Sequence, residues 1–266
     1  MSTLVQQSCA PRGLRGLAVL VTGAASGIGR ATAERCWQDG ATVAALDLDL
    51  RSLGETMQRL EALDAGRYIA LEADVADPIQ VRSALADLAR SLDALYGVVN
   101  VAGIGGYTGD VAETTLEQWG RSLAVNLSGA FHVCREALAL LRAGGRGRIV
   151  NVSSQYGLLG GAGSPAYCAA KAGMIGLTKA MAVDHADEGI LVNCVCPGPI
   201  DTAMLAASGR SGERSKRESR RTATRLLLGR PGRPDDVAGV IAFLLGPDAR
   251  NMTGAVVAVD GGWSAS

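Results

Sequence analysis

A tyrosine, a lysine and a serine have the spacing that a proton-transferring site would need. Tyr167 and Lys171 are four residues apart, so they share one face if this segment is helical. The pKa of a free tyrosine is about 10, and a nearby ammonium group lowers it by stabilising the phenolate. Tyr167 could then act as a general acid or base, a role worth about 10²–10⁴-fold in rate. Such pairs also occur on ordinary helix surfaces, but Ser154, thirteen residues before the tyrosine, favours the catalytic interpretation.

A glycine-rich turn near the amino terminus has the features of a dinucleotide-binding site. Glycines let the backbone approach a pyrophosphate, and the helix that follows offers its first N–H groups. In a chain with 35 glycines an ordinary turn is the alternative, but the position between a predicted strand and a predicted helix favours the cofactor. The turn reads Thr22-Gly23-Ala24-Ala25-Ser26-Gly27-Ile28-Gly29.

An acidic residue indicates which dinucleotide binds. Asp47 ends the second predicted strand, eighteen residues after Gly29. A carboxylate there can accept hydrogen bonds from both hydroxyls of an adenosine ribose and would repel a 2′-phosphate. The nearby Ser26 and Leu48 are uncharged, so the sequence favours NAD over NADP. A solvated carboxylate at the strand end is the alternative, because Asp49 supplies a second acid.

Strand and helix patterns alternate along the whole chain. Seven strands separated by helices predict one α/β domain over residues 1–266, a doubly wound parallel seven-stranded sheet with helices on both faces. Ligands bind such sheets beyond the carboxyl ends of the strands, where Ser154 would lie. Strand ends also place Asp74 near an adenine and Asn100 with Gly103 on the floor of the site, although each alone also suits a turn. The strands are expected at 17–21, 41–46, 68–71, 95–101, 148–152, 190–195 and 255–259, and the helices at 28–38, 53–63, from 78, 116–142, 165–187 and 234–245.

Composition excludes several classes of protein. Apolar residues make up 48% of the chain, which suits a folded core, and 26 basic residues balance 26 acidic ones, which argues against nucleic-acid binding. Six scattered cysteines and two histidines have no familiar zinc spacing, so we expect reduced thiols and no metal. No signal peptide or membrane-spanning run is evident, and a cytoplasmic location is expected.

Taken together, these motifs resemble the short-chain dehydrogenase/reductase superfamily over nearly the whole chain, from about Leu17 to Trp263. Val101 departs from the pattern, because the family often has a second asparagine there. The segments that carry the resemblance are residues 22–29, Asp74, residues 100–103, Asn126, Ser154, Tyr167 with Lys171, Pro197-Gly198, Thr202 and residues 260–262.

The resemblance implies a Rossmann fold, an NAD(P)-dependent reaction at CH–OH groups and a role for each matching residue. Tyr167 would be the general acid/base, Ser154 would hold the substrate oxygen, Lys171 would bind the nicotinamide ribose, and Asn126 would anchor a water in a proton relay. Ser153 competes for the serine role, but its spacing to Tyr167 is one residue too long. The implied cofactor contacts are Gly23, Ser26, Gly27, Ile28, Gly29, Asp47, Asp74, Val75, Asn100, Ala102, Gly103, Tyr167, Lys171, Pro197, Gly198, Ile200 and Thr202.

The substrate end of the sequence is less informative. Ser154, Gln155, Tyr156 and Tyr167 are expected to face the substrate, under a lid formed by residues 203–230. Residues 210–225 of this lid carry seven basic and two acidic residues, which suit an anionic substrate or, alternatively, a solvated surface. Residues 1–16 form an amino-terminal extension.

Three functions follow from this pattern. The first is an NAD-dependent interconversion of a secondary alcohol and a ketone. The second is reduction of a 3-oxoacyl thioester on acyl carrier protein or CoA, against which Asp47 counts. A catalytically silent dinucleotide sensor is the third, although it would not need the phenol of Tyr167. Small residues on the Tyr167 helix allow close helix packing, and the resemblance implies a homotetramer built partly from this helix and the helix at 116–142.

Overall fold

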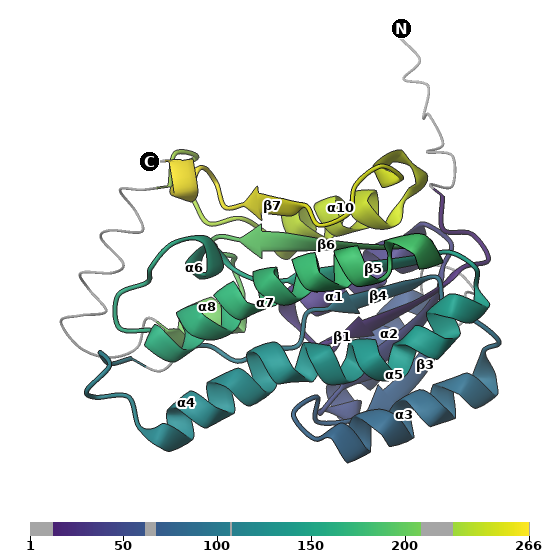
Figure 1. The fold of residues 1–266 in the computed structure, drawn as a ribbon, viewed down its shortest axis with the longest axis horizontal. Helices are drawn as coiled ribbons and strands as arrows, with labels where there is room; N and C mark the ends of the chain where they lie inside the picture. Colours follow the sequence, from purple (N-terminus) through teal and green to yellow (C-terminus); the bar gives the residue numbers. More distant parts are fainter. Residues whose placement is uncertain (1–12, 62–67, 107, 209–225, 266) are drawn as a thin grey trace, which may run out of the picture.

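The computed structural model describes residues 13–61, 68–106, 108–208 and 226–265. Its seven strands form one parallel sheet in the order β3-β2-β1-β4-β5-β6-β7, which confirms the predicted architecture (Figure 1). Most strand residues are buried, as expected for a parallel sheet covered on both faces. The strands are β1 (Ala18–Thr22), β2 (Thr42–Asp47), β3 (Tyr68–Glu72), β4 (Gly97–Asn100), β5 (Gly147–Val152), β6 (Ile190–Pro197) and β7 (Val256–Val259).

Helices cover both faces of the sheet and enclose two apolar cores. One core lies between the sheet and α1 (Gly27–Gln38), α2 (Leu50–Glu61) and α10 (Pro234–Leu245). The other lies between the sheet and α3 (Pro78–Ser91), α5 (Gly129–Ala143) and α7 (Pro165–Asp184), which cross in front of the strands in Figure 1. The remaining helical segments are α4 (Leu116–Leu123), η1 (Ala124–Ser128), α6 (Gln155–Leu158), η2 (Ala186–Glu188), α8 (Ala203–Ser208), η3 (Pro247–Ala249) and η4 (Trp263–Ala265).

Local hydrogen bonds explain where the structure departs from the predicted elements. Helix α2 begins three residues earlier than expected because the Asp49 carboxylate accepts the N–H groups of Arg51 and Ser52, at 3.0 and 3.1 Å. Asp49 is therefore a helix cap. The helix expected over 116–142 is divided by a π-helical segment, η1, between α4 and α5. Two short helices after strand ends, α6 and α8, had no clear periodicity to predict them.

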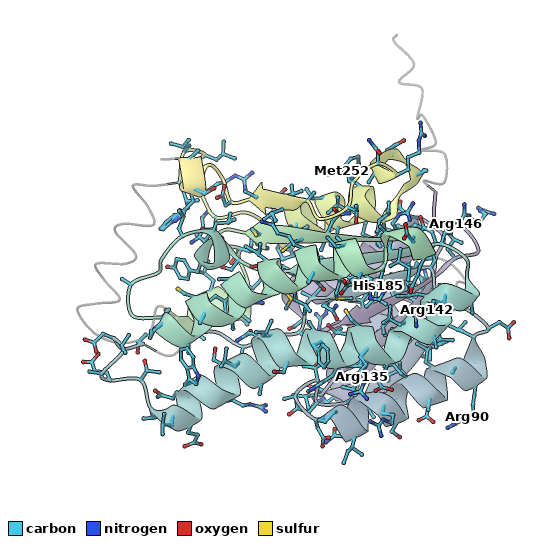
Figure 2. The ribbon with its side chains drawn as sticks, viewed as in Figure 1. Arg90, Arg135, Arg142, Arg146, His185 and Met252 are labelled. Atoms are coloured by element: carbon cyan, nitrogen blue, oxygen red, sulfur yellow. The ribbon has the colours of Figure 1, made fainter. Side chains whose placement is uncertain are left out.

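The two histidines contact groups of the protein itself, and the described cysteines form no disulfide. His185 lies beside Arg142 near the amino ends of β5 and β6 (Figure 2). Arg142 donates to both carboxylate oxygens of Glu188, at 2.7 and 3.0 Å, and His185 Nδ1 lies 3.1 Å from one of them. His132 Nδ1 lies 3.0 Å from the Val75 carbonyl oxygen. The described cysteines are free thiols, and no described cluster of three or more ligand-type residues could hold a metal. In the same part of the chain no helix has the length and apolar character needed to cross a bilayer.

Residues 1–12 of the predicted extension (1–16) lie outside the described part of the chain, as do residues 209–225 of the predicted lid (203–230), with its basic segment at 210–225. The rest of the extension is described, and its Leu14 is buried in the core beside α1 and α10.

Candidate active site

The candidate residues gather at the carboxyl edge of the sheet. Thr22, the last residue of β1, is in register with Asn100, the last of β4, and Asn100 is in register with Asn151 near the end of β5. The turns that follow these strands therefore meet at one edge. The Thr22 hydroxyl accepts the N–H groups of Val101 and Ala102, both at 3.1 Å, which ties the loop after β4 to the glycine turn after β1.

The glycine turn is a cradle that side chains would fill. Gly23 and Gly27 have φ values of +67° and +51°, a left-handed conformation that favours glycine. A Cβ atom on Gly29 would lie 2.0 Å from the Gly23 carbonyl oxygen, and one on Gly23 would lie 2.9 Å from Ala102 N. Ser26 precedes α1 without a capping bond from its side chain. This open backbone at a helix amino terminus fits the pyrophosphate of a dinucleotide.

Asp47 faces this turn from the end of β2. Its carboxylate accepts the N–H groups of Ala25 at 2.9 Å and Leu48 at 2.8 Å, and it is partly exposed. Arg30, one turn into α1, donates to the Ala25 carbonyl oxygen. The analysis of the sequence missed Arg30 because only the fold brings its guanidinium back to the turn. From the end of β2 this carboxylate could accept hydrogen bonds from an adenosine ribose.

The turn after β3 is held by two helices. The Asp74 carboxylate accepts the Ala76 N–H at 2.8 Å and Arg121 of α4 at 3.2 Å. Val75 is buried and packs closely on Gly129 of α5. A Cβ atom on Gly129 would lie 2.7 Å from Cγ2 of Val75. This turn is therefore fixed beside the end of β2, where the Ala73 N–H donates to the Asp47 carbonyl oxygen at 3.1 Å.

The side chain of Asn100 is buried below the site. Its amide nitrogen donates to the side-chain oxygen of Asn151 at 2.8 Å and lies 3.1 Å from the Cys134 sulfur. Its side chain therefore supports the floor of the site from below.

Two elements supply the three residues expected to handle the proton. Ser154 caps α6, directly after β5, and its hydroxyl accepts the Tyr156 N–H at 3.1 Å. Tyr167 and Lys171 lie one turn apart on α7, with Lys171 Nζ 5.7 Å from the centre of the tyrosine ring. Lys171 is 4% exposed, and its ammonium donates to the Val152 carbonyl oxygen at 2.9 Å. The structure thus brings together three residues that come from two separate elements, α6 and α7.

Asn126 reaches the same site from the π-helical segment. Its side-chain oxygen accepts the Ile104 N–H at 3.0 Å, and its amide lies 3.4 Å from the Ser122 hydroxyl. A Cβ on Gly103 would lie 2.8 Å from Asn126 Oδ1 and 3.6 Å from Lys171 Nζ, so both groups border this glycine. A π-turn is often found at a functional site, because it re-aims side chains within a helix.

Burial controls the electrostatics of the pair on α7. Burial lowers the pKa of Lys171 from 10.5 to about 8, against the opposing influence of Cys194 and Cys196 on β6. Burial also raises the pKa of Tyr167, although the hydrogen bond with Ser154 acts in the opposite direction. The protein alone therefore keeps the phenol protonated at neutral pH, and a positive charge from a bound cofactor would be needed to lower its pKa.

The segment after β6 closes the other side of the site. Gly198 is packed so tightly that a Cβ there would lie 2.6 Å from Asp260 Cα, and its N–H donates to the Val259 carbonyl oxygen at 3.0 Å. Ile200 is buried, and the Thr202 methyl would lie 3.2 Å from a Cβ on Gly27. The segment from Pro197 to Thr202 thus spans from β6 to the glycine turn.

The substrate side is formed by α6 and the loop after β4. The Tyr156 ring meets the Tyr167 ring edge-on, with centroids 6.4 Å apart, and Gly106 packs against Tyr167. Gln155 is 5% exposed, and its side-chain oxygen is buried without a hydrogen-bond partner among the described residues. Met204 of α8, which the sequence did not single out, packs on Gly105, where a Cβ would lie 3.5 Å from its Cγ.

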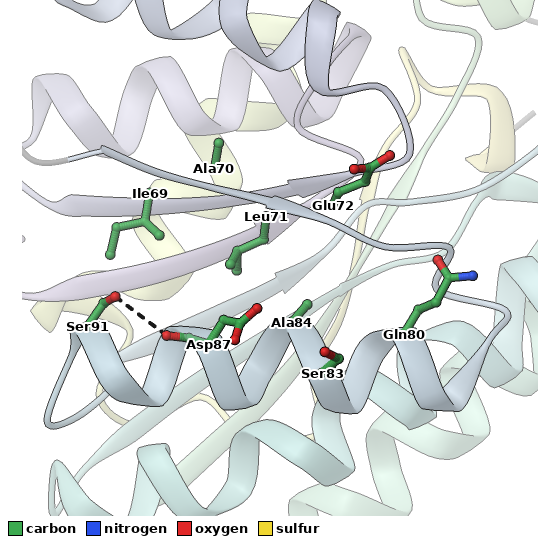
Figure 3. A pocket seen from close by; sticks show the side chains of 9 residues that line it. All are labelled: Ile69, Ala70, Leu71, Glu72, Gln80, Ser83, Ala84, Asp87 and Ser91. Atoms are coloured by element: carbon green, nitrogen blue, oxygen red, sulfur yellow. Dashed lines mark hydrogen bonds between the residues drawn. The ribbon is translucent and has the colours of Figure 1, made fainter.

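A groove of about 420 Å³ lies elsewhere, between the edge strand β3 and α3 (Figure 3). Strands β2, β1 and β4 separate it from β5. One of its two acids, Asp87, already pairs with Arg90. None of the predicted site residues lines this groove, so it is not the candidate site. The groove is lined by Ile69, Ala70, Leu71, Glu72, Gln80, Ser83, Ala84, Asp87 and Ser91.

Comparisons with known proteins show which family the chain resembles. Residues 23–264 match the family model described as Enoyl-(Acyl carrier protein) reductase. The chain is 35% identical over 252 residues to 2-(S)-hydroxypropyl-CoM dehydrogenase 3 of Xanthobacter autotrophicus, covering 95% of this chain and 98% of that protein. It is 36% identical to a cyclohexanol dehydrogenase of an Acinetobacter species, covering 92% and 94%.

A solved structure extends the comparison to a bound cofactor. The chain has a TM-score of 0.87 and 35% identity to a putative NAD(P)-dependent gluconate 5-dehydrogenase from Beutenbergia cavernae, which contains NADP at low occupancy. The match covers 96% of this chain and 100% of that one.

Proposed function

The chain belongs to the short-chain dehydrogenase/reductase family and is an NAD(P)-dependent oxidoreductase of CH–OH groups, and on this premise we propose that it interconverts a secondary alcohol and a ketone, with NAD preferred. The observation that carries the proposal is the meeting of Ser154, Tyr167 and Lys171 beside the glycine turn. A bound nicotinamide would supply or accept the hydride. The protein's own part is to bind, orient and exchange a proton.

The four residues have different roles in this reaction. The Ser154 hydroxyl holds the substrate oxygen within reach of Tyr167, and Tyr167 gives or takes the hydroxyl proton. The buried ammonium of Lys171 favours the phenolate and can bind a ribose hydroxyl. Asn126, which borders Gly103 beside Lys171, can hold a water that carries the proton toward solvent.

Asp47 supports the preference for NAD. Its carboxylate, fixed by the N–H groups of Ala25 and Leu48, would accept the ribose hydroxyls and repel a phosphate in their place. Arg30 is the one described cation that hydrogen-bonds within the turn, and it is engaged with Ala25 and lies 4.0 Å from Glu55. We therefore expect Asp47, and not Arg30, to bind the ribose.

The experiment measures reduction of NAD⁺ and of NADP⁺ with a panel of secondary alcohols. Cyclohexanol and a 2-hydroxypropyl thioether are good first choices, because relatives are named for such substrates. We expect turnover with at least one alcohol and a higher kcat/KM with NAD⁺. Absence of turnover with every alcohol and with both coenzymes would refute the proposal.

A 3-oxoacyl thioester reductase is the second candidate, favoured by the 37% identity of the chain to a 3-oxoacyl-[acyl-carrier-protein] reductase of Thermotoga maritima. Acetoacetyl-CoA assayed with NADH and with NADPH separates the two. Rapid oxidation of either coenzyme would favour the thioester reaction, and NADPH as the faster coenzyme would also contradict the role of Asp47.

We further propose a cytoplasmic homotetramer. Exposed apolar side chains on α4, α5 and α7 support an interface there, since Leu116 and Val183 are 91% and 80% exposed and Trp119 and Phe131 are also exposed. The free thiols of the described cysteines suit a reducing compartment. Light scattering coupled to size exclusion tests the assembly, and a monomer at micromolar concentration would refute it.

A further inference from the structure

Three consecutive residues, Val152, Ser153 and Ser154, contact the two α7 residues of the proton-transfer site. The first two contact Lys171, and the third contacts Tyr167. The Val152 carbonyl oxygen accepts the Lys171 ammonium at 2.9 Å, and the Ser153 hydroxyl donates to the Lys171 carbonyl oxygen at 2.7 Å. The next residue, Ser154, hydrogen-bonds with Tyr167. The segment that carries the catalytic serine therefore holds α7 at two points, one turn from the tyrosine.

The contact between Ser153 and Lys171 is buried among β5, β6 and α6. Ser153 is 3% exposed, and its N–H donates to the Val195 carbonyl oxygen of β6 at 2.8 Å. A Cβ on Gly157 of α6 would lie 2.5 Å from the Ser153 hydroxyl and 2.7 Å from the Lys171 carbonyl oxygen. Cys196 of β6 faces the same hydroxyl. Strand, strand and helix thus fix this hydroxyl against one carbonyl oxygen of α7.

From this geometry we propose that Ser153 is a positioning residue, which keeps α7 in register with β5 so that Tyr167 and Lys171 stay aligned with Ser154. The inference rests on the proposed function and deepens it. The neighbouring serines then have separate tasks: Ser154 faces the reacting oxygen, and Ser153 sets the distance between the two elements that carry the site. Loss of the Ser153 hydroxyl would let α7 move relative to β5, because a buried hydrogen bond between the elements is removed.

The test compares Ser153→Ala with Thr178→Val. Thr178 is also fully buried on α7, donates to the Met174 carbonyl oxygen at 2.8 Å and accepts from Asn151 at 2.9 Å. Both variants remove a buried hydroxyl between β5 and α7, but Thr178 lies two turns beyond Lys171. The control therefore reproduces the structural damage without the positioning effect.

We expect Ser153→Ala to lower kcat about five-fold, the effect of one hydrogen bond, with the Kd for NADH unchanged. We also expect the ultraviolet titration of the Tyr167 phenolate, obtained by difference from Tyr167→Phe, to move to higher pH. The charged or titratable groups around the pair are Cys168 beside Tyr167, and Cys194 and Cys196 facing Lys171 from β6. Thr178→Val should lower the Tm and leave kcat and the titration as in the wild type.

Two results would overturn the proposal. One is a wild-type kcat and phenolate titration in Ser153→Ala, and the other is the same loss of kcat in Thr178→Val. The titration needs no substrate, so it tests the positioning of Tyr167 even if the proposed alcohol reaction fails.

Discussion

Replacing Lys171 with methionine should stabilise the protein while it removes activity. Lys171 is 4% exposed, and burial lowers its pKa from 10.5 to about 8. At about 1.36 kcal/mol per pKa unit, the buried charge costs about 3 kcal/mol of folding free energy below pH 8. Methionine fills a similar volume without the charge but loses the bond to Val152, worth about 1 kcal/mol. The expected net gain is about 2 kcal/mol at pH 7.

The sign of the pH dependence follows from the same pKa values. Between pH 8 and 10.5 the unfolded chain keeps a proton on Lys171 that the folded protein has released, so wild-type stability rises with pH in this range. The advantage of Lys171→Met should therefore shrink across the range and vanish near its upper end.

Denaturant unfolding at pH 7 and at pH 10 measures both effects, with Lys179→Met, an exposed site on the same helix, as the control. A gain of about 2 kcal/mol corresponds to a Tm rise of about 4–8 °C. The reasoning is refuted if Lys171→Met is less stable than the wild type at pH 7, or if its advantage does not change with pH.

Three further substitutions test the site. Tyr167→Phe should lower kcat by about 10²–10⁴-fold without changing the Kd for NADH, and retained turnover would exclude Tyr167 as the acid/base. Asp47→Ser should lower the ratio of kcat/KM for NAD⁺ over NADP⁺ by on the order of 10- to 100-fold, the value of hydrogen bonds to a charged group; an unchanged ratio would contradict its role. Gly29→Ala should abolish NADH quenching of tryptophan fluorescence, because its Cβ would lie 2.0 Å from the Gly23 carbonyl oxygen, whereas Gly54→Ala, with open space around it, should not.

The fold was predictable because its signals are local. Each β-strand is a short apolar run that ends at a turn residue, and Pro78 and Pro234 mark helix starts where their missing N–H costs nothing. The order of the strands in the sheet, with β1 between β2 and β4, is a long-range property, which the resemblance to a family implies and the structure confirms.

The site was predictable as a set of residue types, but not in its supporting contacts. Spacing singled out Tyr167, Lys171 and Ser154, whereas the bonds from Ser153 and Val152 to Lys171 depend on how α7 packs on β5. The π-helical turn at Asn126 also escaped prediction, because the sequence pattern indicated one continuous helix over 116–142.

The central claim is that hydride passes between a nicotinamide and a carbinol carbon while Tyr167 exchanges the proton. The most direct test reduces a ketone such as cyclohexanone with NADH deuterated at the transferred position and analyses the alcohol by mass spectrometry. We predict one deuterium on the carbinol carbon with the wild type and almost no alcohol with Tyr167→Phe. An alcohol without deuterium, or equal yields from both proteins, would contradict the account.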